Sequence, residues 1–336
     1  MNKRMLIVLV VVLALLTMAC SCSFAGFPGL MRGSISPSGE IITEEREVSN
    51  NVTEVEISGD GYLYFTQGET AELILEGDAN YINNIETRVS GDTLIIRPKN
   101  NTFFNWFRDR EEVTYTLTLP TVEEFSSAGA LDVEMGDLTV EDLQMSFSGS
   151  SDLFADTIEA ENLTISGSGS TDIILGDVEC NDFLGKFSGS ADFFADSITA
   201  VTVRFDSSAS YDMSVAKIVA SESVSVDASG SADMAIEELV TKVFTMDTSG
   251  SANMQIEAGE VEDQFIEMSG SGSYYAADLK SETADLDGGG SADFTVWVTD
   301  QLTIDGSGST KVNYYGDPEV EQRTSGSTTI KQLDKE

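Results

Sequence analysis

The chain has 336 residues, with 18 lysines and arginines against 58 aspartates and glutamates, no histidine, and a formal net charge of −40 at pH 7. This charge excludes a protein that tracks nucleic-acid phosphates, because such a protein needs basic side chains to neutralise them. It also disfavours electrostatic docking on anionic lipid, and it leaves high solubility, cation binding or a basic partner as uses for the acidity.

Residues 1–19 are predicted to be a signal peptide of lipoprotein type. Lys3 and Arg4 precede an apolar run over residues 5–16, which is too short to span a bilayer comfortably. The sequence Leu-Thr-Met-Ala-Cys that ends at Cys20 is similar to a bacterial lipobox, in which Cys20 would be lipidated. Cleavage after Ala25 is the alternative and would release a soluble protein. Either way the protein is expected to be exported, and a lipid anchor would hold it at the periplasmic or outer surface of a bacterial envelope.

Residues 20–46 lack sustained periodicity and are predicted to be a tether. Residues 47–120 are predicted to form an irregular β lead-in, because short alternating segments are separated by Gly, Asn and Asp. An aromatic cluster interrupts that pattern and is either a loop that caps the open end of the fold or an exposed binding tip. Its members are Phe103, Phe104, Trp106 and Phe107.

Residues 121–332 repeat a Ser-Gly-Ser phrase, whose central position we call the marker. It recurs every twenty residues, with one step of twenty-one and two of eighteen, at Gly129, Gly149, Gly169, Gly189, Ala209, Gly230, Gly250, Gly270, Gly290, Gly308 and Gly326. Four residues after each marker the side chain is apolar, and the flanking residues alternate with period two, so one face of each strand is expected to be buried. The marker glycine is expected to face inward at a bend.

Twenty-residue units of this kind predict an all-β fold, a single-stranded parallel β-helix (β-solenoid) in which each coil buries its apolar face against its neighbours. Residues 333–336 are predicted to be a charged tail. Cys180 is the only cysteine in the repeated body, so it cannot form a disulfide there and is expected to be a small buried hydrophobe.

Two polar columns of the repeat are candidate sites. Three residues after the marker stand Asp132, Asp152, Asp172, Asp192, Asp212 and Asp233, here called the aspartate ladder. Stacked carboxylates repel one another, so the ladder is expected either to accept backbone hydrogen bonds or to bind Ca²⁺, the one cofactor that the sequence suggests. The serines directly before the markers, such as Ser168 and Ser188, would either bond along the stack or offer a polar face to a ligand.

The order of segments and the repeated Ser-Gly-Ser-Gly-Ser-Thr-Asp phrase lead to an ending with Tyr315-Gly316-Asp317-Pro318 and a last Ser-Gly-Ser at Gly326. This arrangement resembles the head GIN domain family of auto-transporter adhesins over residues 47–332. The resemblance implies a β-solenoid on the bacterial cell envelope, in a family without an established biochemical activity.

Two functions follow as hypotheses. The first is a non-enzymatic, adhesin-like surface protein that presents its Ser/Asp-rich face to a glycan or a protein. The second is a structural or self-associating envelope component without a ligand. An enzyme is disfavoured, because histidine is absent and the carboxylates are spaced by coil instead of converging on a cleft. No nucleic-acid partner is expected, and a membrane is expected to be contacted only through a lipid anchor.

Overall fold

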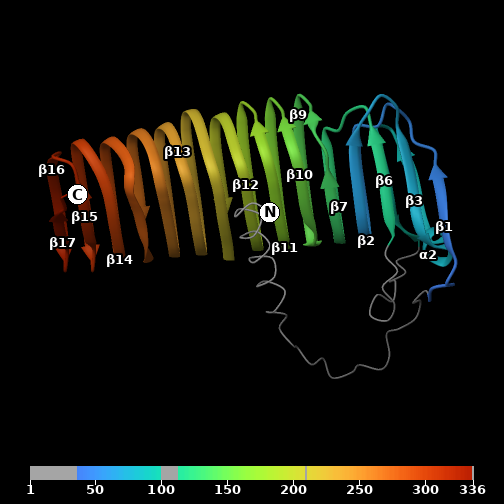
Figure 1. Ribbon diagram of the computed structural model, residues 1–336. Coiled ribbons are helices and arrows are strands. Elements are labelled where there is room, and N and C mark those ends of the chain that lie inside the picture. Colours follow the sequence, from blue (N-terminus) through green and yellow to red (C-terminus); the bar gives the residue numbers. More distant parts are fainter. Residues whose placement is uncertain (1–35, 100–112, 209, 335–336) are drawn as a thin grey trace, which may run out of the picture. The chain divides into compact units, whose positions relative to one another are not determined.

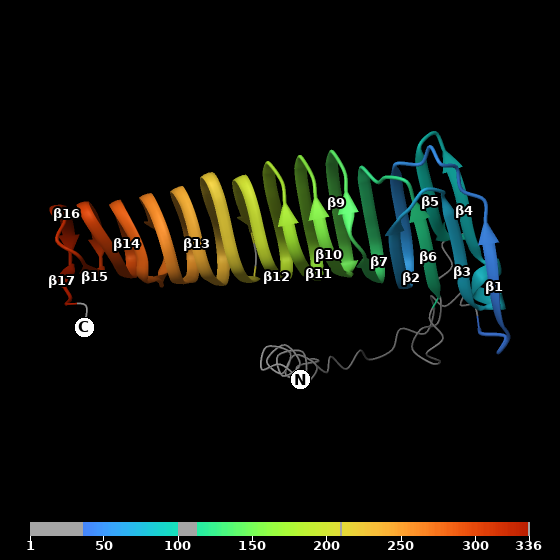
Figure 2. The ribbon, with the colours of Figure 1, turned by 45° about the horizontal axis from the view of Figure 1, so that its top comes forward.

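The computed structural model describes residues 36–99, 113–208 and 210–334, which form a nearly all-β stack of coils (Figures 1 and 2). The elements at the N-terminal end of the stack are β1 (Ile41–Arg46), β2 (Glu54–Gln67), β3 (Glu72–Asp78), α2 (Ala79–Asn83), β4 (Ile85–Ser90), β5 (Thr93–Pro98) and β6 (Thr114–Leu119). The coils that follow are built from β7 (Glu124–Met135), β8 (Leu138–Thr139), β9 (Asp142–Ser150), β10 (Asp152–Glu159), β11 (Asn162–Glu179), β12 (Asp182–Ser207), β13 (Ser210–Met268), β14 (Ser271–Gly308), β15 (Lys311–Tyr315), β16 (Glu319–Gly326) and β17 (Thr329–Gln332).

The register between coils confirms the predicted β-solenoid. β11 pairs with β12 in parallel at a constant offset of twenty residues, beginning with Asn162 opposite Asp182. The single step of twenty-one comes from a bulge in the pairing of β12 with β13, next to Ala200. In the last coils the offset is eighteen, as between Asp293 and Lys311. The irregular steps in the sequence are therefore local changes in coil length within one continuous ladder.

The core of the stack is filled by the inward half of each alternating strand. The column four residues after the marker is buried from Val133 to Val312, and its last member, Ile330, is partly buried. Between the coils of β12, Phe183, Phe193 and Phe205 pack with ring centroids 5.3–5.9 Å apart. Each fully buried phenylalanine contributes roughly 2–3 kcal/mol through removal of its surface from water, so the core, with Cys180 among its buried side chains, accounts for stacking without disulfides.

The marker glycines were predicted to face inward, and this prediction is wrong. They lie at an exposed outer corner of the coil. Gly169 has a φ of +112°, and a Cβ built on it would collide with the backbone carbonyl of Gly149 in the preceding coil. A Cβ built on Gly149 would likewise collide with the backbone carbonyl of Gly129. Glycine suits a left-handed backbone with so close an approach, which accounts for glycine at every marker except Ala209.

The lead-in is more complex than a simple run of coils. β2 is the first coil and pairs in parallel with β7, with Gly59 opposite Gly129. The intervening chain makes an excursion in which β5 and β6 pair with the other side of β2, and β4 and β3 then add antiparallel to them. β1 pairs antiparallel with β3. Residues 41–46 are therefore a strand, and the predicted tether is wrong for that segment.

The short helix α2 closes this end of the stack and buries Tyr81 and Ile82 (Figure 1). Asp78, also buried, caps the helix by accepting a hydrogen bond from the Asn80 N–H at 2.8 Å. It also accepts from the backbone N–H groups of Ser38 and Gly39, which precede β1, at 2.7 and 2.8 Å. Burial alone would raise the pKa of Asp78, but these bonds and the Ser38 hydroxyl favour the carboxylate and leave the pKa below its ordinary value. At the opposite end, Leu333 of the predicted tail donates its N–H to the Tyr314 carbonyl, so the ladder extends into the tail.

Candidate functional site

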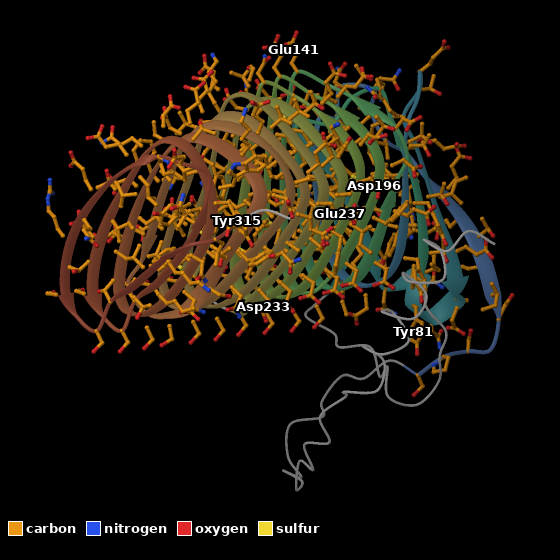
Figure 3. The ribbon with its side chains drawn as sticks, turned by 60° about the vertical axis from the view of Figure 1, so that its left-hand side comes forward. Tyr81, Glu141, Asp196, Asp233, Glu237 and Tyr315 are labelled. Atoms are coloured by element: carbon orange, nitrogen blue, oxygen red, sulfur yellow. The ribbon has the colours of Figure 1, made fainter. Side chains whose placement is uncertain are left out.

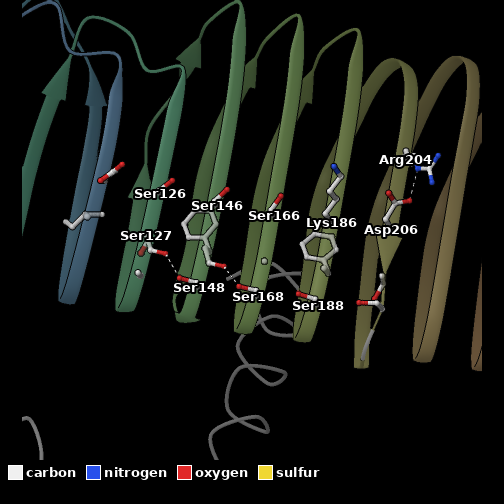
Figure 4. Close-up of a pocket in the computed structure, with 18 of the residues that line it drawn as sticks. Ser126, Ser127, Ser146, Ser148, Ser166, Ser168, Lys186, Ser188, Arg204 and Asp206 are labelled. Atoms are coloured by element: carbon white, nitrogen blue, oxygen red, sulfur yellow. Dashed lines mark hydrogen bonds and ion pairs between the residues drawn. The ribbon is translucent and has the colours of Figure 1, made fainter. Parts of the chain in front are cut away.

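A groove of about 1000 Å³ runs along one sheet face of the stack, across successive coils (Figure 4). It is lined by the residues one, two and three places before each marker, from β2 and β5 at one end to the first half of β13 at the other. Because neighbouring coils are in register, each of these places forms a column along the groove at a spacing of about 4.8 Å.

The column three places before the marker carries the hydroxyl groups of the groove. Ser126 pairs with Ser146, and Ser146 with Ser166. All three are half-buried, and within the described part of the chain no protein group forms a hydrogen bond with their hydroxyls. The rings of Phe147 and Phe187 lie beneath the hydroxyls, but they are only 2% and 3% exposed and belong to the core. The groove thus offers a row of unused hydroxyls.

The serine column directly before the marker has a different role. The hydroxyl of Ser148 donates to the Ser127 carbonyl at 3.1 Å, and Ser168 donates to the Phe147 carbonyl at 3.4 Å, in each case in the preceding coil. Ser269 forms the corresponding bond at 3.3 Å. Ser168, Ser188 and Ser269 are exposed, as predicted for the first two, and Ser148 is half-buried. The hydroxyls that form these bonds tie one coil to the next and are less available to a ligand.

Three basic side chains also line the groove. Arg204 donates to Asp206 at 2.7 Å and to Asp227 at 2.6 Å. Arg97, at the β5 end, pairs with Glu86 at 3.1 Å. Lys186 continues the serine column directly after Ser166 and lines the groove. In Figure 4 its side chain extends along its own coil.

The aspartate ladder lies on the strands after the corner and points outward, as predicted. Asp152 stands opposite Asp132, and Asp192 opposite both Asp172 and Asp212. Figure 3 shows Asp233 pointing away from the core. None of the ladder residues lines the groove, so the Ser/Asp-rich surface expected from the sequence is two separate faces that meet at the glycine corner.

The electrostatics of the ladder favour the retention of protons. Burial, followed by the charges of Asp152 and Asp192, raises the pKa of Asp172 to about 6. Burial and a neighbouring carboxylate also raise the pKa values of Asp192 and Asp212. The repulsion between neighbouring carboxylates is offset in part by the backbone, because the Asp172 N–H donates a hydrogen bond to the Asp152 carboxylate at 3.3 Å. This is the hydrogen-bonding alternative that the sequence suggested.

The aspartate ladder ends at Asp233, because the next residue in its column is uncharged. Asn253 takes the next place in the column, and its amide donates to Asp233 at 2.8 Å. The Ser273 hydroxyl then donates to the Asn253 side-chain oxygen at 2.9 Å. Within residues 36–99, 113–208 and 210–334, no three carboxylate or thiol side chains gather closely enough to hold a metal ion. Binding of Ca²⁺ by the ladder stays a prediction.

A second acidic column was not predicted from the sequence. It occupies the same place as the groove serines, three residues before the marker, but in the later coils, and comprises Asp206, Asp227, Asp247, Glu267, Asp287 and Asp305. Burial, together with Asp206 and Asp247, raises the pKa of Asp227, while Arg204 lowers it. The repeat alignment already contained this column. Three places before the marker, the residue is serine up to Ser166, lysine at Lys186 and acidic from Asp206 to Asp305.

Exposed apolar side chains stand beside the aspartate ladder. Phe154 pairs with Ile174, and their exposed fractions are 44% and 38%. Phe194 follows Ile174 in the same column and is half-buried. This short apolar row lies outside the groove and gives the ladder face a different chemistry from the hydroxyl face.

The predicted cap or binding loop, with Phe103, Phe104, Trp106 and Phe107, lies outside the described residues, as does Cys20. Among the described residues, α2 and the antiparallel strands beside it lie at the N-terminal end of the stack, and the role of the aromatic cluster stays a prediction. No helix within the described ranges is long and apolar enough to cross a membrane.

A family model described as "Putative auto-transporter adhesin, head GIN domain" matches residues 51–236 and again residues 203–318. The chain belongs to this family. Membership confirms the resemblance seen in the sequence, and an adhesin family indicates a protein of the cell surface or envelope. In this head GIN domain the match spans the first coil β2, the groove and both acidic columns.

Solved structures with a similar chain trace include a "putative lipid binding protein" from Parabacteroides distasonis, with 20% identity and a TM-score of 0.42, covering 89% of this chain and 99% of that chain. A "putative adhesin" from Parabacteroides merdae has 14% identity and a TM-score of 0.41, covering 90% of this chain and 100% of the other. Similarity at this level carries no argument about a ligand. Among curated proteins, none matches this chain.

Proposed function

We propose that this head GIN domain is a non-enzymatic surface-binding module whose groove holds an extended glycan along the axis of the stack. The observation that carries the proposal is the column of unused hydroxyls, Ser126, Ser146 and Ser166. A sugar chain presents hydroxyls along its edges. A column of protein hydroxyls can donate hydrogen bonds to these groups and accept hydrogen bonds from them.

The spacing also suits a polymer. Neighbouring coils place equivalent hydroxyls at intervals of about 4.8 Å, which is of the same order as the length of one pyranose unit in an extended chain. A ligand with repeating units could therefore make the same contact on several coils. Each contact is weak by itself, and their sum supports binding without a deep pocket.

The test compares two variants in the same coil. Ser166→Trp fills the groove, whereas Ser170→Trp places an equal volume at an exposed position just beyond the corner and outside the groove. Both proteins would be applied to an array of bacterial and host glycans, and any ligand would then be titrated by calorimetry. We expect Ser166→Trp to weaken binding at least tenfold and Ser170→Trp to leave it unchanged. Equal affinities of the two variants, or no glycan bound by the unsubstituted protein, would contradict the proposal.

Attachment to the envelope is part of the proposal and rests on the sequence similarity of residues 16–20 to a lipobox. We propose that Cys20 carries the lipid. Metabolic labelling with a fatty-acid analogue should mark the expressed chain but not its Cys20→Ala variant. Labelling of both, or of neither, would remove the lipid anchor.

Self-association is a second candidate, favoured by the last coil. Within the described part of the chain, β16 pairs with β14 alone and β17 with β15 alone, and most of their residues are exposed. An uncovered strand edge invites another strand. Light scattering that shows a concentration-dependent dimer would support an assembly role, and a monomer at all concentrations would exclude it.

A further inference from the structure

Lys186 occupies the point in the groove at which the hydroxyl column becomes acidic. The column reads Ser126, Ser146, Ser166, Lys186 and then Asp206 along successive coils. The Lys186 side chain is exposed, and no ion pair holds it within the described part of the chain. Asp206, on its far side, accepts from Arg204 instead.

The other basic side chains of the groove are already neutralised. Arg204 is held by two carboxylates, and Arg97 pairs with Glu86. In a protein with a net charge of −40, an uncommitted ammonium group next to three free hydroxyls is a local exception. Its charge lies within reach of a groove ligand, at distances over which screening by salt is weak.

We propose that the groove selects a glycan with a carboxylate-bearing sugar, and that Lys186 binds this carboxylate while hydroxyls of the glycan contact Ser146 and Ser166. The inference rests on the proposed function and names the class of its ligand. A dense polyanion is disfavoured, because the acidic surface of the protein repels it at long range. The fitting ligand is a largely neutral chain with isolated uronic acids.

The experiment uses matched probes with the full exported chain. One probe is a neutral β-1,4-linked glucan hexasaccharide, and the other is the same hexasaccharide with C6 of one internal unit oxidised to a carboxylate. A second matched pair, built on β-1,4-mannan, covers a different sugar stereochemistry. Affinities would be measured by calorimetry at one fixed ionic strength for the unsubstituted protein, Lys186→Gln and Lys217→Gln. Lys217 pairs with Glu238 at 3.0 Å outside the groove, so its variant changes the net charge equally.

We expect the carboxylate-bearing member of a pair to bind about tenfold more tightly, in the range of a charge-assisted hydrogen bond. Lys186→Gln should abolish this preference, and Lys217→Gln should retain it. Equal binding of both members would overturn the inference and leave the glycan proposal standing. A preference that survives in Lys186→Gln would overturn the assignment to Lys186. Failure of every probe to bind would count against both proposals.

Discussion

The marker glycines give the sharpest test of the stacking geometry. Gly169 combines a φ of +112° with a backbone carbonyl, that of Gly149, at the place that a Cβ would occupy. In Gly169→Ala the left-handed backbone costs about 1–2 kcal/mol. The displaced carbonyl weakens ladder hydrogen bonds at about 1 kcal/mol each. Together these effects lower the stability by roughly 3–4 kcal/mol.

Two other glycines separate the two contributions. Gly91 has a φ of +72° but no atom within 4 Å of the place that a Cβ would occupy, so Gly91→Ala carries only the backbone cost. Gly136 has an ordinary backbone and open space around it. Gly136→Ala should be neutral, or stabilising by a few tenths of a kcal/mol, because the unfolded chain loses conformational freedom.

Thermal unfolding followed by far-ultraviolet circular dichroism would rank the three variants. For a chain of this size, 1 kcal/mol corresponds to a shift of about 2 °C. We expect Gly169→Ala to melt roughly 6–8 °C lower, Gly91→Ala roughly 2–4 °C lower, and Gly136→Ala within about 1 °C of the unsubstituted protein. A Gly169→Ala protein that melts like Gly91→Ala would show that the close approach of the coils adds no cost, and the explanation of the repeat would be wrong.

Three further predictions concern charge. The raised pKa of Asp172, about 6, lies above that of the unfolded chain, so the stability it contributes is present in acid and lost as the pH rises through 6. Asp172→Asn should therefore raise the melting temperature by about 1–2 °C at pH 7.5 after solvent screening, and by nothing at pH 4; an equal gain at both pH values would refute this. Asp78 has a lowered pKa and is charged at pH 7. Asp78→Asn removes this charged cap, so it should destabilise the protein by about 1–3 kcal/mol at pH 7 and by less in strong acid. A loss of stability that does not depend on pH would point to packing. Binding of Ca²⁺ by the aspartate ladder is tested by calorimetric titration and by thermal unfolding. If the ladder binds Ca²⁺, the melting temperature should rise with Ca²⁺, and it should rise less in Asp172→Asn. The absence of both binding heat and a melting shift would exclude Ca²⁺ binding.

The sequence was sufficient for the architecture of the repeated body. The twenty-residue spacing predicted the coil, and the apolar column from Val133 onward predicted the core, because period-two alternation leaves a strand no other way to bury one face. The outward position of Asp172 and its neighbours, and the burial of Cys180, followed from the same alternation.

Other features depend on contacts that no local pattern encodes. β2 pairs with β7 across an excursion of 70 residues, so the antiparallel closure by β1, β3 and β4 could not be read from spacing. The inward orientation predicted for Gly169 was wrong because a glycine with positive φ breaks the alternation on which the prediction relied. The groove was also missed, since it depends on which serines already bond to the preceding coil, as Ser148 does and Ser146 does not.

The measurement that tests the central proposal most directly is photo-crosslinking with a bound oligosaccharide. A glycan identified on the array would carry a diazirine at one internal sugar, and labelled peptides would be located by mass spectrometry. Binding in the groove predicts labels on the segments that contain Ser146, Ser166 and Lys186, with loss of label in Ser166→Trp. Labels concentrated on the aspartate-ladder face, around Phe154 and Ile174, would contradict the groove as the binding site.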